Sequence, residues 1–352
     1  MADPRPEAQD PGMADARLEA HDLMVSFPVA GGRTLRAVDG VSFRVGAGQI
    51  LGLVGESGCG KTTAARCMAG LLTPDSGTVR LDGAQLGARR TAAQRRAVQM
   101  IFQDPYSSLN PRLTIRRMLR ELLTVHKLVP RPAMEERCRE LMRLVGLPAA
   151  ALDGLPAQFS GGQRQRIAIA RALAVEPRVL IADEPVSALD VSVQATILRL
   201  FAELRDSLGL AMIIISHNLA VVRQLSDQVA VMYLGRIVEE GGTGELFGSV
   251  RHPYARALLA AAPRLHQRGL ARPDLRGEPP SPVDPPSGCR FHPRCPLAAD
   301  ICQREDPRPR PVRPGSTHIV ACHFGADPVP AEAGPGTPAV IRDPRRVRGS
   351  RP

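Results

Sequence analysis

Residues 50–69 read ILGLV, then GESGCGKT, then TAARCMA. The middle segment matches the phosphate-binding pattern G-x-x-x-x-G-K-[ST], and the runs on either side predict a strand before it and a helix after it. In such a loop the backbone N–H groups surround the β-phosphate, Lys61 reaches the β- and γ-phosphates, and the Thr62 hydroxyl binds Mg²⁺. We expect Cys59 to be a tolerated small residue rather than a reactive thiol. The predicted nucleotide contacts are Gly55, Glu56, Ser57, Gly58, Cys59, Gly60, Lys61, Thr62 and Thr63.

Two further apolar runs end in polar residues. The run VLIADEP (179–185) predicts a buried parallel strand with Asp183 and Glu184 at its tip, where ligands bind in such sheets. We expect Asp183 to hold Mg²⁺ and Glu184 to orient or deprotonate an attacking water. A third strand, 211–216, precedes His217. A lone histidine is more often structural than catalytic. His217 is therefore a catalytic candidate only in combination with the other motifs.

The tetrapeptide Ser160-Gly161-Gly162-Gln163 adds a second glycine-rich turn, between the phosphate loop and the acid pair. Backbone N–H groups at a helix start carry partial positive charge, and glycines let them approach an anion. Together with Gln103 (100–105, MIFQDP), Ser187-Ala188-Leu189-Asp190 and His217, the motif order resembles that of ATP-binding cassette (ABC) proteins.

The resemblance covers residues 20–250 and implies an α/β fold: a P-loop NTPase with a mixed sheet core, an α-helical subdomain (about 104–165) and a small Cys-containing C-terminal extension. It implies ATP hydrolysis with Glu184, His217 and Gln103 as catalytic residues, and Mg²⁺ held by Thr62, Gln103 and Asp183. Asp190 would couple two sites across a dimer. Phe27 would stack on adenine, although it could instead belong to the core. The residues implied to cap the γ-phosphate of an ATP held by a second subunit are Ser160, Gly161, Gly162 and Gln163.

Two stretches narrow the resemblance. Residues 104–112 (DPYSSLNPR) and residues 277–296, from GEPPSP to GCRFHPRCP, are similar to ATP-binding subunits of bacterial oligopeptide, dipeptide and nickel importers. This implies a second ABC ATPase subunit, with a paralogue favoured, two transmembrane permease subunits and an extracytoplasmic solute-binding protein. A soluble ABC mechanoenzyme acting on nucleic acid or ribosomes is the first rival. The second alternative is a redox-sensing module in which the cysteine cluster is primary and ATP is regulatory.

Composition limits the other function classes. The chain has 352 residues, of which 43% are hydrophobic, so it can bury a large core. No apolar run approaches ~18 residues, and residues 1–22 lack an apolar signal core. Together with these observations, the resemblance to importer subunits implies a peripheral protein on the cytoplasmic face of the bacterial plasma (inner) membrane. The net charge is +11, but the arginines are scattered and aromatic residues make up only 3%, so we expect no nucleic-acid partner.

The chain divides into five predicted segments. A disordered tail (1–16) precedes the ABC domain (17–262), in which apolar residues at helical spacing within 113–158 predict amphipathic helices. A Pro-rich linker (263–288) leads to a Cys-rich extension (289–325). We expect the basic tail (326–352) to be disordered, with attraction to a lipid surface as the alternative.

Four of the seven cysteines lie in the extension, at Cys289, Cys295, Cys302 and Cys322. In a reducing compartment a metal is a natural use of four thiolates, but the spacing C-x5-C-x6-C-x19-C matches neither a zinc ribbon nor the common ferredoxin run. The resemblance to peptide importers favours a [4Fe-4S] cluster. Zinc and free, packed cysteines remain as alternatives.

Overall fold

The structure is a computed structural model that describes residues 16–104, 108–261 and 277–325. The predicted N-terminal tail up to residue 15, residues 263–276 of the predicted linker (263–288) and the basic tail lie outside the described residues. So do residues 105–107, which belong to one of the two stretches that narrowed the family resemblance.

An eight-stranded mixed sheet forms the centre of the described part of the chain, in the order β11-β12-β10-β9-β3-β8-β7-β6. The strands β3, β6, β7, β8 and β9 run parallel to their neighbours among this group, whereas β10, β11 and β12 pair antiparallel. The strand bounds are β3 (Ile50–Val54), β6 (Val98–Ile101), β7 (Val179–Asp183), β8 (Ala211–Ser216), β9 (Gln228–Tyr233), β10 (Arg236–Gly242), β11 (Arg310–Pro311) and β12 (Ile319–Val320).

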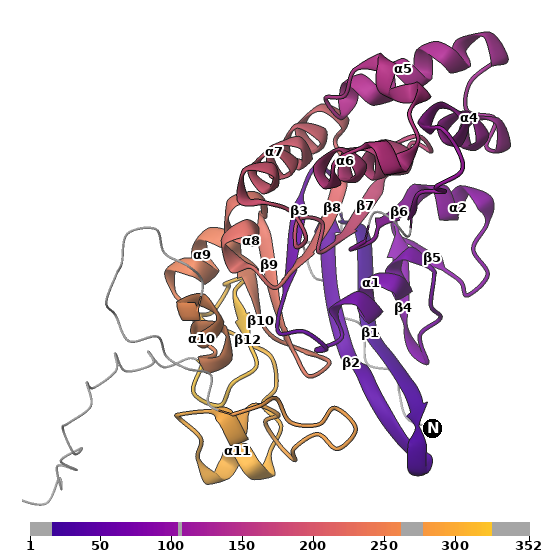
Figure 1. Cartoon of the computed structure of the whole chain (residues 1–352). Coiled ribbons are helices and arrows are strands. Elements are labelled where there is room, and N and C mark those ends of the chain that lie inside the picture. The colour runs from indigo at the N-terminus through magenta and orange to yellow at the C-terminus, as the bar shows by residue number, and fades with distance from the viewer. Residues whose placement is uncertain (1–15, 105–107, 262–276, 326–352) are drawn as a thin grey trace, which may run out of the picture.

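A second, four-stranded antiparallel sheet has the order β2-β1-β4-β5 (Figure 1). It contains β1 (Ala16–Val29), β2 (Arg33–Gly46), β4 (Ser76–Leu81) and β5 (Ala84–Leu86). Strands β4 and β5 form a hairpin with its turn at Asp82 and Gly83, whose φ values of 49° and 76° are those of a tight two-residue hairpin turn. Residues 76–81 form the first strand of this hairpin.

Helices cover both faces of the central sheet. The α-helices are α1 (Lys61–Ala69), α2 (Ala92–Ala97), α4 (Ile115–Val125), α5 (Met134–Leu144), α6 (Gly161–Leu173), α7 (Val191–Leu208), α8 (Leu219–Leu225), α9 (Thr243–Gly248), α10 (Pro253–Ala261) and α11 (Asp300–Arg304). The 3-10 turns are η2 (Ala30–Gly32), η3 (Arg131–Ala133), η4 (Ala149–Asp153), η5 (Pro156–Gln158) and η6 (His292–Arg294). None of the helices in the described ranges is both long and apolar enough to cross a bilayer.

Side chains alternate between two cores along the parallel strands. On β7 and β8, Leu180, Met212 and Ile214 face the core that includes α4, α5 and α6, while Ile181 and Ile213 face the core that includes α1 and the second sheet. Burial on both faces explains why these strands are continuous apolar runs in the sequence. The predicted α/β fold with a mixed sheet core and a helical subdomain is therefore confirmed.

The C-terminal extension continues the central sheet. Strand β12 pairs with β10, so the extension prolongs the sheet beyond the cassette (Figure 1). Glu239 of β10 is buried beneath this contact, and its carboxylate accepts hydrogen bonds from the backbone N–H groups of Arg251 (2.7 Å) and His252 (2.8 Å). The same carboxylate pairs with His318 Nε2 at 2.7 Å. Glu239 thus connects strand β10 of the ABC domain with the start of α10 and with the extension.

Candidate functional site

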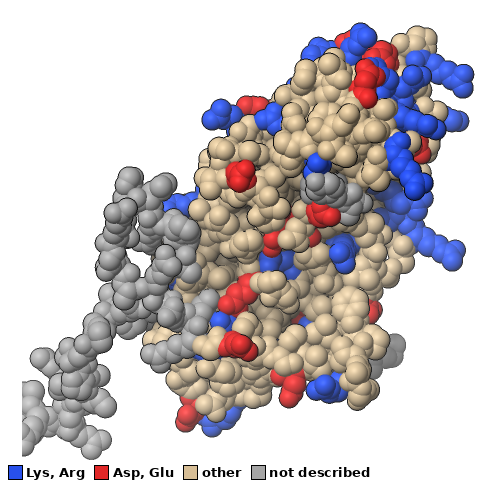
Figure 2. Space-filling model, viewed as in Figure 1, with Lys and Arg blue, Asp and Glu red and all other residues tan. Residues whose placement is uncertain are grey.

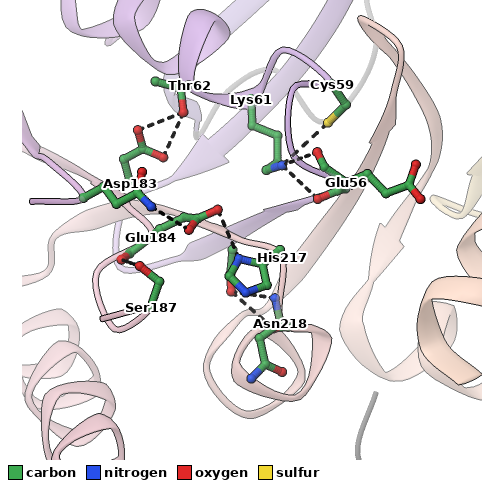
Figure 3. A network of polar contacts seen from close by, with 12 residues as sticks. Glu56, Cys59, Lys61, Thr62, Asp183, Glu184, Ser187, His217 and Asn218 are labelled. Carbon is green, nitrogen blue, oxygen red and sulfur yellow. Dashed lines mark hydrogen bonds and ion pairs between the residues drawn. The ribbon is translucent and has the colours of Figure 1, made fainter. Parts of the chain in front are cut away.

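The phosphate loop follows β3 and ends where α1 begins at Lys61. The Lys61 ammonium is buried and donates to the backbone oxygens of Gly55 and Glu56, both at 2.8 Å (Figure 3). Gly60 has φ 106°, and a Cβ there would lie 2.0 Å from the Ala37 carbonyl oxygen, so only glycine fits. Burial raises the pKa of the Cys59 thiol, although the charge of Lys61 lowers it; the net rise favours the unreactive thiol form.

Asp183, at the tip of β7, accepts hydrogen bonds from Thr62 Oγ1 at 2.9 and 3.1 Å (Figure 3). Burial raises the pKa of Asp183; the Thr62 hydroxyl lowers it and the nearby Glu184 charge raises it further. A hydroxyl and a carboxylate in contact beside a phosphate loop are the oxygen donors that Mg²⁺ prefers. These two residues therefore fit the predicted ion.

Glu184 brings together the three predicted catalytic side chains. Its Oε1 lies 3.1 Å from His217 Nδ1, and its Oε2 accepts a hydrogen bond from Gln103 Nε2 at 3.1 Å. Glu184 has φ 45°, an uncommon conformation for a residue other than glycine, and it is held there by its N–H bond to the Ile215 carbonyl (2.9 Å). Gln103 lies just beyond β6 and His217 just beyond β8, so three strand ends converge on one carboxylate.

A cavity of about 870 Å³ lies over the loop. It brings the phosphate loop to the same space as Gln103, Glu184 and His217, and Phe27 also lines it. Four lining residues come from elsewhere: Leu35 and Ala37 of β2, Leu258 of α10, and Pro282 of the predicted linker. The cavity is large enough for a nucleotide, and its polar groups converge where a triphosphate would lie.

The SGGQ turn lies on the surface at the start of α6. Ser160 and Gln163 form a reciprocal capping box, in which each side chain accepts from the other residue's backbone N–H (3.3 and 3.0 Å). Ser160, Gly161 and Gln163 are exposed. Among the described residues that line the cavity, none comes from residues 160–163, and Asp190 is likewise outside that lining. Residues 160–163, which we call the signature turn, therefore do not line the nucleotide cavity of their own chain.

The four cysteines of the extension lie in one region but do not form a metal site. The Cys289 N–H donates to the Cys302 carbonyl at 2.8 Å, and Cys289 and Cys295 pack beside Phe291. Within residues 16–104, 108–261 and 277–325, no three His, Cys, Asp or Glu side chains are grouped to hold a metal ion. Burial raises the pKa of Cys289 to about 12 and that of Cys295 to about 11 in the metal-free chain. The structure does not support the expected [4Fe-4S] cluster or zinc.

The geometry agrees with the comparisons with known proteins. The family model described as "ABC transporter" matches residues 38–187, and the model "Oligopeptide/dipeptide transporter, C-terminal region" matches residues 238–302. A probable peptide ABC transporter ATP-binding protein, y4tS of Sinorhizobium fredii, is 47% identical, with 96% of this chain and 98% of the relative covered. The chain belongs to the ABC transporter family. It is an ATP-binding subunit with the ATPase domain of that family.

Other members support this assignment. The oligopeptide transport ATP-binding protein AppF of Bacillus subtilis is 44% identical, covering 87% of this chain and 97% of the relative. Among solved structures, cbiO1 of Clostridium perfringens has a TM-score of 0.60 at 28% identity, covering 66% of this chain and 91% of that one. A dimeric ATP-binding cassette, MJ0796, bound to ADP and Pi has a TM-score of 0.58 at 25% identity, covering 64% and 98%.

Sequence reasoning missed the residues that support the phosphate loop from the C-terminal side. The Glu56 N–H donates to the Tyr254 hydroxyl at 2.8 Å, and the Glu56 carboxylate pairs with Arg294. Arg294 lies in the FHPRCP stretch that pointed to the peptide-importer group, but nothing in the sequence indicated its partner.

Proposed function

We propose that this chain is the ATP-hydrolysing subunit of a bacterial importer for peptides and that it acts in a head-to-tail pair with a second cassette, with a paralogue favoured. The observation that carries the proposal is the content of the nucleotide cavity. It gathers Lys61, Thr62, Gln103, Glu184 and His217, yet none of its described lining residues comes from the signature turn. A second subunit's signature turn would supply the missing cap.

The proposed chemistry follows from the side chains around the γ-phosphate position. Lys61 would bind the β- and γ-phosphates, and Thr62, Asp183 and Gln103 would hold Mg²⁺, which neutralises charge on the phosphate oxygens. Glu184 would orient the attacking water and accept its proton. Gln103 and His217 each contact one carboxylate oxygen of Glu184, so they fix the direction in which this base faces. His217 would also donate to charge that develops on the γ-phosphate.

Dimer closure would drive transport. ATP binds the closed pair better than the open pair, so binding closes the dimer and hydrolysis releases it. The helical subdomain around α4 and α5 would transmit this motion to two permease subunits on the cytoplasmic face of the membrane. Figure 2 shows Lys and Arg side chains gathered over that region, and Arg116, Arg117 and Arg120 line a groove there. An extracytoplasmic binding protein would deliver the solute, so we place no peptide site on this chain.

The catalytic proposal is tested by Glu184→Gln. The amide keeps the size of the side chain but cannot accept a proton, so we expect the ATPase rate of the assembled transporter to fall by ~10²- to 10⁴-fold. ATP binding should persist, and the variant should accumulate as an ATP-bound dimer. Glu203→Gln, at an exposed position of α7, is the matched control and should hydrolyse ATP normally. Normal phosphate release by Glu184→Gln would remove Glu184 from its proposed role.

The substrate class is tested by uptake. The names of the related proteins favour peptides over nickel. Cells that carry Glu184→Gln in place of the native chain should lose uptake of labelled di- and oligopeptides and keep uptake of ⁶³Ni²⁺. Loss of nickel uptake alone would contradict the peptide assignment. ATPase activity that responds to DNA or ribosomes, without permease subunits, would favour the mechanoenzyme instead.

A further inference from the structure

A partly buried ion pair joins Arg294 of the C-terminal extension to Glu56 of the phosphate loop. Arg294, in the turn η6, donates from both terminal nitrogens to the two carboxylate oxygens of Glu56, at 2.8 and 3.0 Å. The arginine side chain is only 4% exposed, whereas Glu56 is 22% exposed. A bidentate pair fixes the orientation of both groups, and the arginine of this pair is shielded from solvent.

Glu56 is also tied at its backbone. Its carbonyl accepts the Lys61 ammonium at 2.8 Å, and its N–H donates to the Tyr254 hydroxyl at 2.8 Å. The peptide that positions the phosphate-binding lysine is therefore held at three points, one of which is the extension. A shift of the Glu56 carboxylate would move the carbonyl that orients Lys61.

The surroundings of Arg294 make its position well defined. Its guanidinium lies over the rings of Tyr233 (5.9 Å) and Phe291 (6.0 Å), and it contacts the Tyr233 hydroxyl at 3.4 Å. Tyr233, Tyr254 and Phe291 contact one another with ring centroids 4.5–5.5 Å apart. The hydrogen bonds that Arg294 donates to Glu56 raise the pKa of Arg294, so its guanidinium stays charged. Phe291 comes from the extension, Tyr233 from β9 and Tyr254 from α10. These three aromatic rings therefore join the extension to the ABC domain.

We infer that Arg294 is a positioning residue for ATP binding, and that the folded state of the C-terminal extension sets the nucleotide affinity of this cassette through the Arg294–Glu56 pair. The inference rests on the proposed ATP site. Pro282, in the segment that leads into the extension, lines the same cavity.

Arg294→Lys separates positioning from bulk folding. Lysine keeps the charge and the aliphatic stem but cannot make the two parallel bonds of a guanidinium. In the full-length chain, a fluorescent ATP analogue should bind roughly tenfold more weakly, within the range usual for coupling between sites. In the assembled transporter the KM for ATP should rise while kcat at saturating ATP stays within about twofold, because Glu184, Gln103 and His217 do not contact Arg294.

Arg313→Lys is the matched control. Arg313 also joins the extension to the cassette, through Glu245 at 3.1 Å, but it is 72% exposed and does not line the nucleotide cavity. Its substitution should leave the ATP affinity unchanged. Glu56→Gln tests whether Arg294 acts through the Glu56 carboxylate. In that background, Arg294→Lys should have little additional effect on the ATP affinity. An unchanged ATP affinity in Arg294→Lys, or an equal loss in both backgrounds, would overturn the inference.

Coupling must act in both directions. Saturating Mg·ATP should therefore slow amide hydrogen exchange in residues 288–295 of the wild-type chain, and this protection should be largely lost in Arg294→Lys. A purely structural arginine would leave the ATP-dependent protection unchanged, and that result would overturn the inference. If instead the wild-type chain binds no ATP, the proposed function fails. Lys61→Ala is the negative control: it gives the hydrogen-exchange result expected for a chain that does not bind ATP.

Discussion

At the scale of single residues, the phosphate loop is held by contacts that leave little room for change. Lys61 is fixed by two carbonyls of its own loop, and the loop turns beneath the Ala37 carbonyl at Gly60. These contacts arrange the N–H groups and the ammonium before a phosphate arrives, so binding needs little rearrangement.

Gly60→Ala should abolish ATP binding and destabilise the chain. The new methyl group would lie 2.0 Å from a backbone oxygen at φ 106°, so the loop must move. Gly58→Ala is the control, because its φ of 79° carries strain but no heavy atom lies within 4 Å of the added Cβ. That control should cost only about 1–2 kcal/mol. Thermal unfolding and nucleotide titration measure both effects; equal losses in the two variants would contradict the steric argument.

The sequence predicted the chemical groups of the site better than the distant residues that hold the phosphate loop in place. The strand, loop and helix around residues 50–69 and the acid pair after β7 follow from local patterns. Their convergence on Glu184 agrees with the rule that parallel strands present their carboxyl ends at one edge. The Arg294–Glu56 pair could not be predicted, because its members are 238 positions apart and either residue alone reads as an ordinary surface charge.

At the scale of elements, the extension is part of the sheet rather than a separate appendage. The short strands β11 and β12 were not predicted, because two residues each give no detectable alternation. Their position depends on tertiary contacts. Asp39 of β2, for example, is bonded by Arg236 of β10 and Arg290 of the extension. Burial alone would raise the pKa of Asp39, but these two arginines lower it below its usual range.

The junction between β10 and α10 should make the stability depend on pH. His252 is fully buried, and burial lowers its pKa from 6.5 to about 3. Below pH 6.5 the unfolded chain binds a proton here that the folded chain refuses. The free energy of unfolding should therefore fall as the pH drops from 6.5 towards 3, by at most ~1.4 kcal/mol per pH unit from this group.

Urea unfolding between pH 7 and pH 5 measures this dependence. In His252→Asn the amide oxygen can still accept the Tyr254 N–H that His252 Nδ1 accepts at 3.1 Å, but the side chain no longer titrates. The slope of stability against pH should be shallower in this variant, whatever its absolute stability. Parallel slopes for the two proteins would show that His252 is accessible to protons in the folded state.

At the scale of the whole molecule, the phosphate loop and the signature turn of one chain do not meet at the same nucleotide cavity. The loop lies in the nucleotide cavity, whereas the described residues 160–163 are outside its lining and mostly exposed. The central claim is that two such chains, or this chain and a paralogue, complete each other's sites. The capping box of Ser160 and Gln163 keeps the turn ordered for that contact.

The most direct test is a structure of the assembled transporter with ATP and Glu184→Gln in this chain. We predict that the ATP bound to Lys61 of this chain also contacts the signature turn of the second ATPase subunit through its γ-phosphate. An ATP enclosed entirely by this chain, with residues 160–163 folded over its own phosphate loop, would contradict the account.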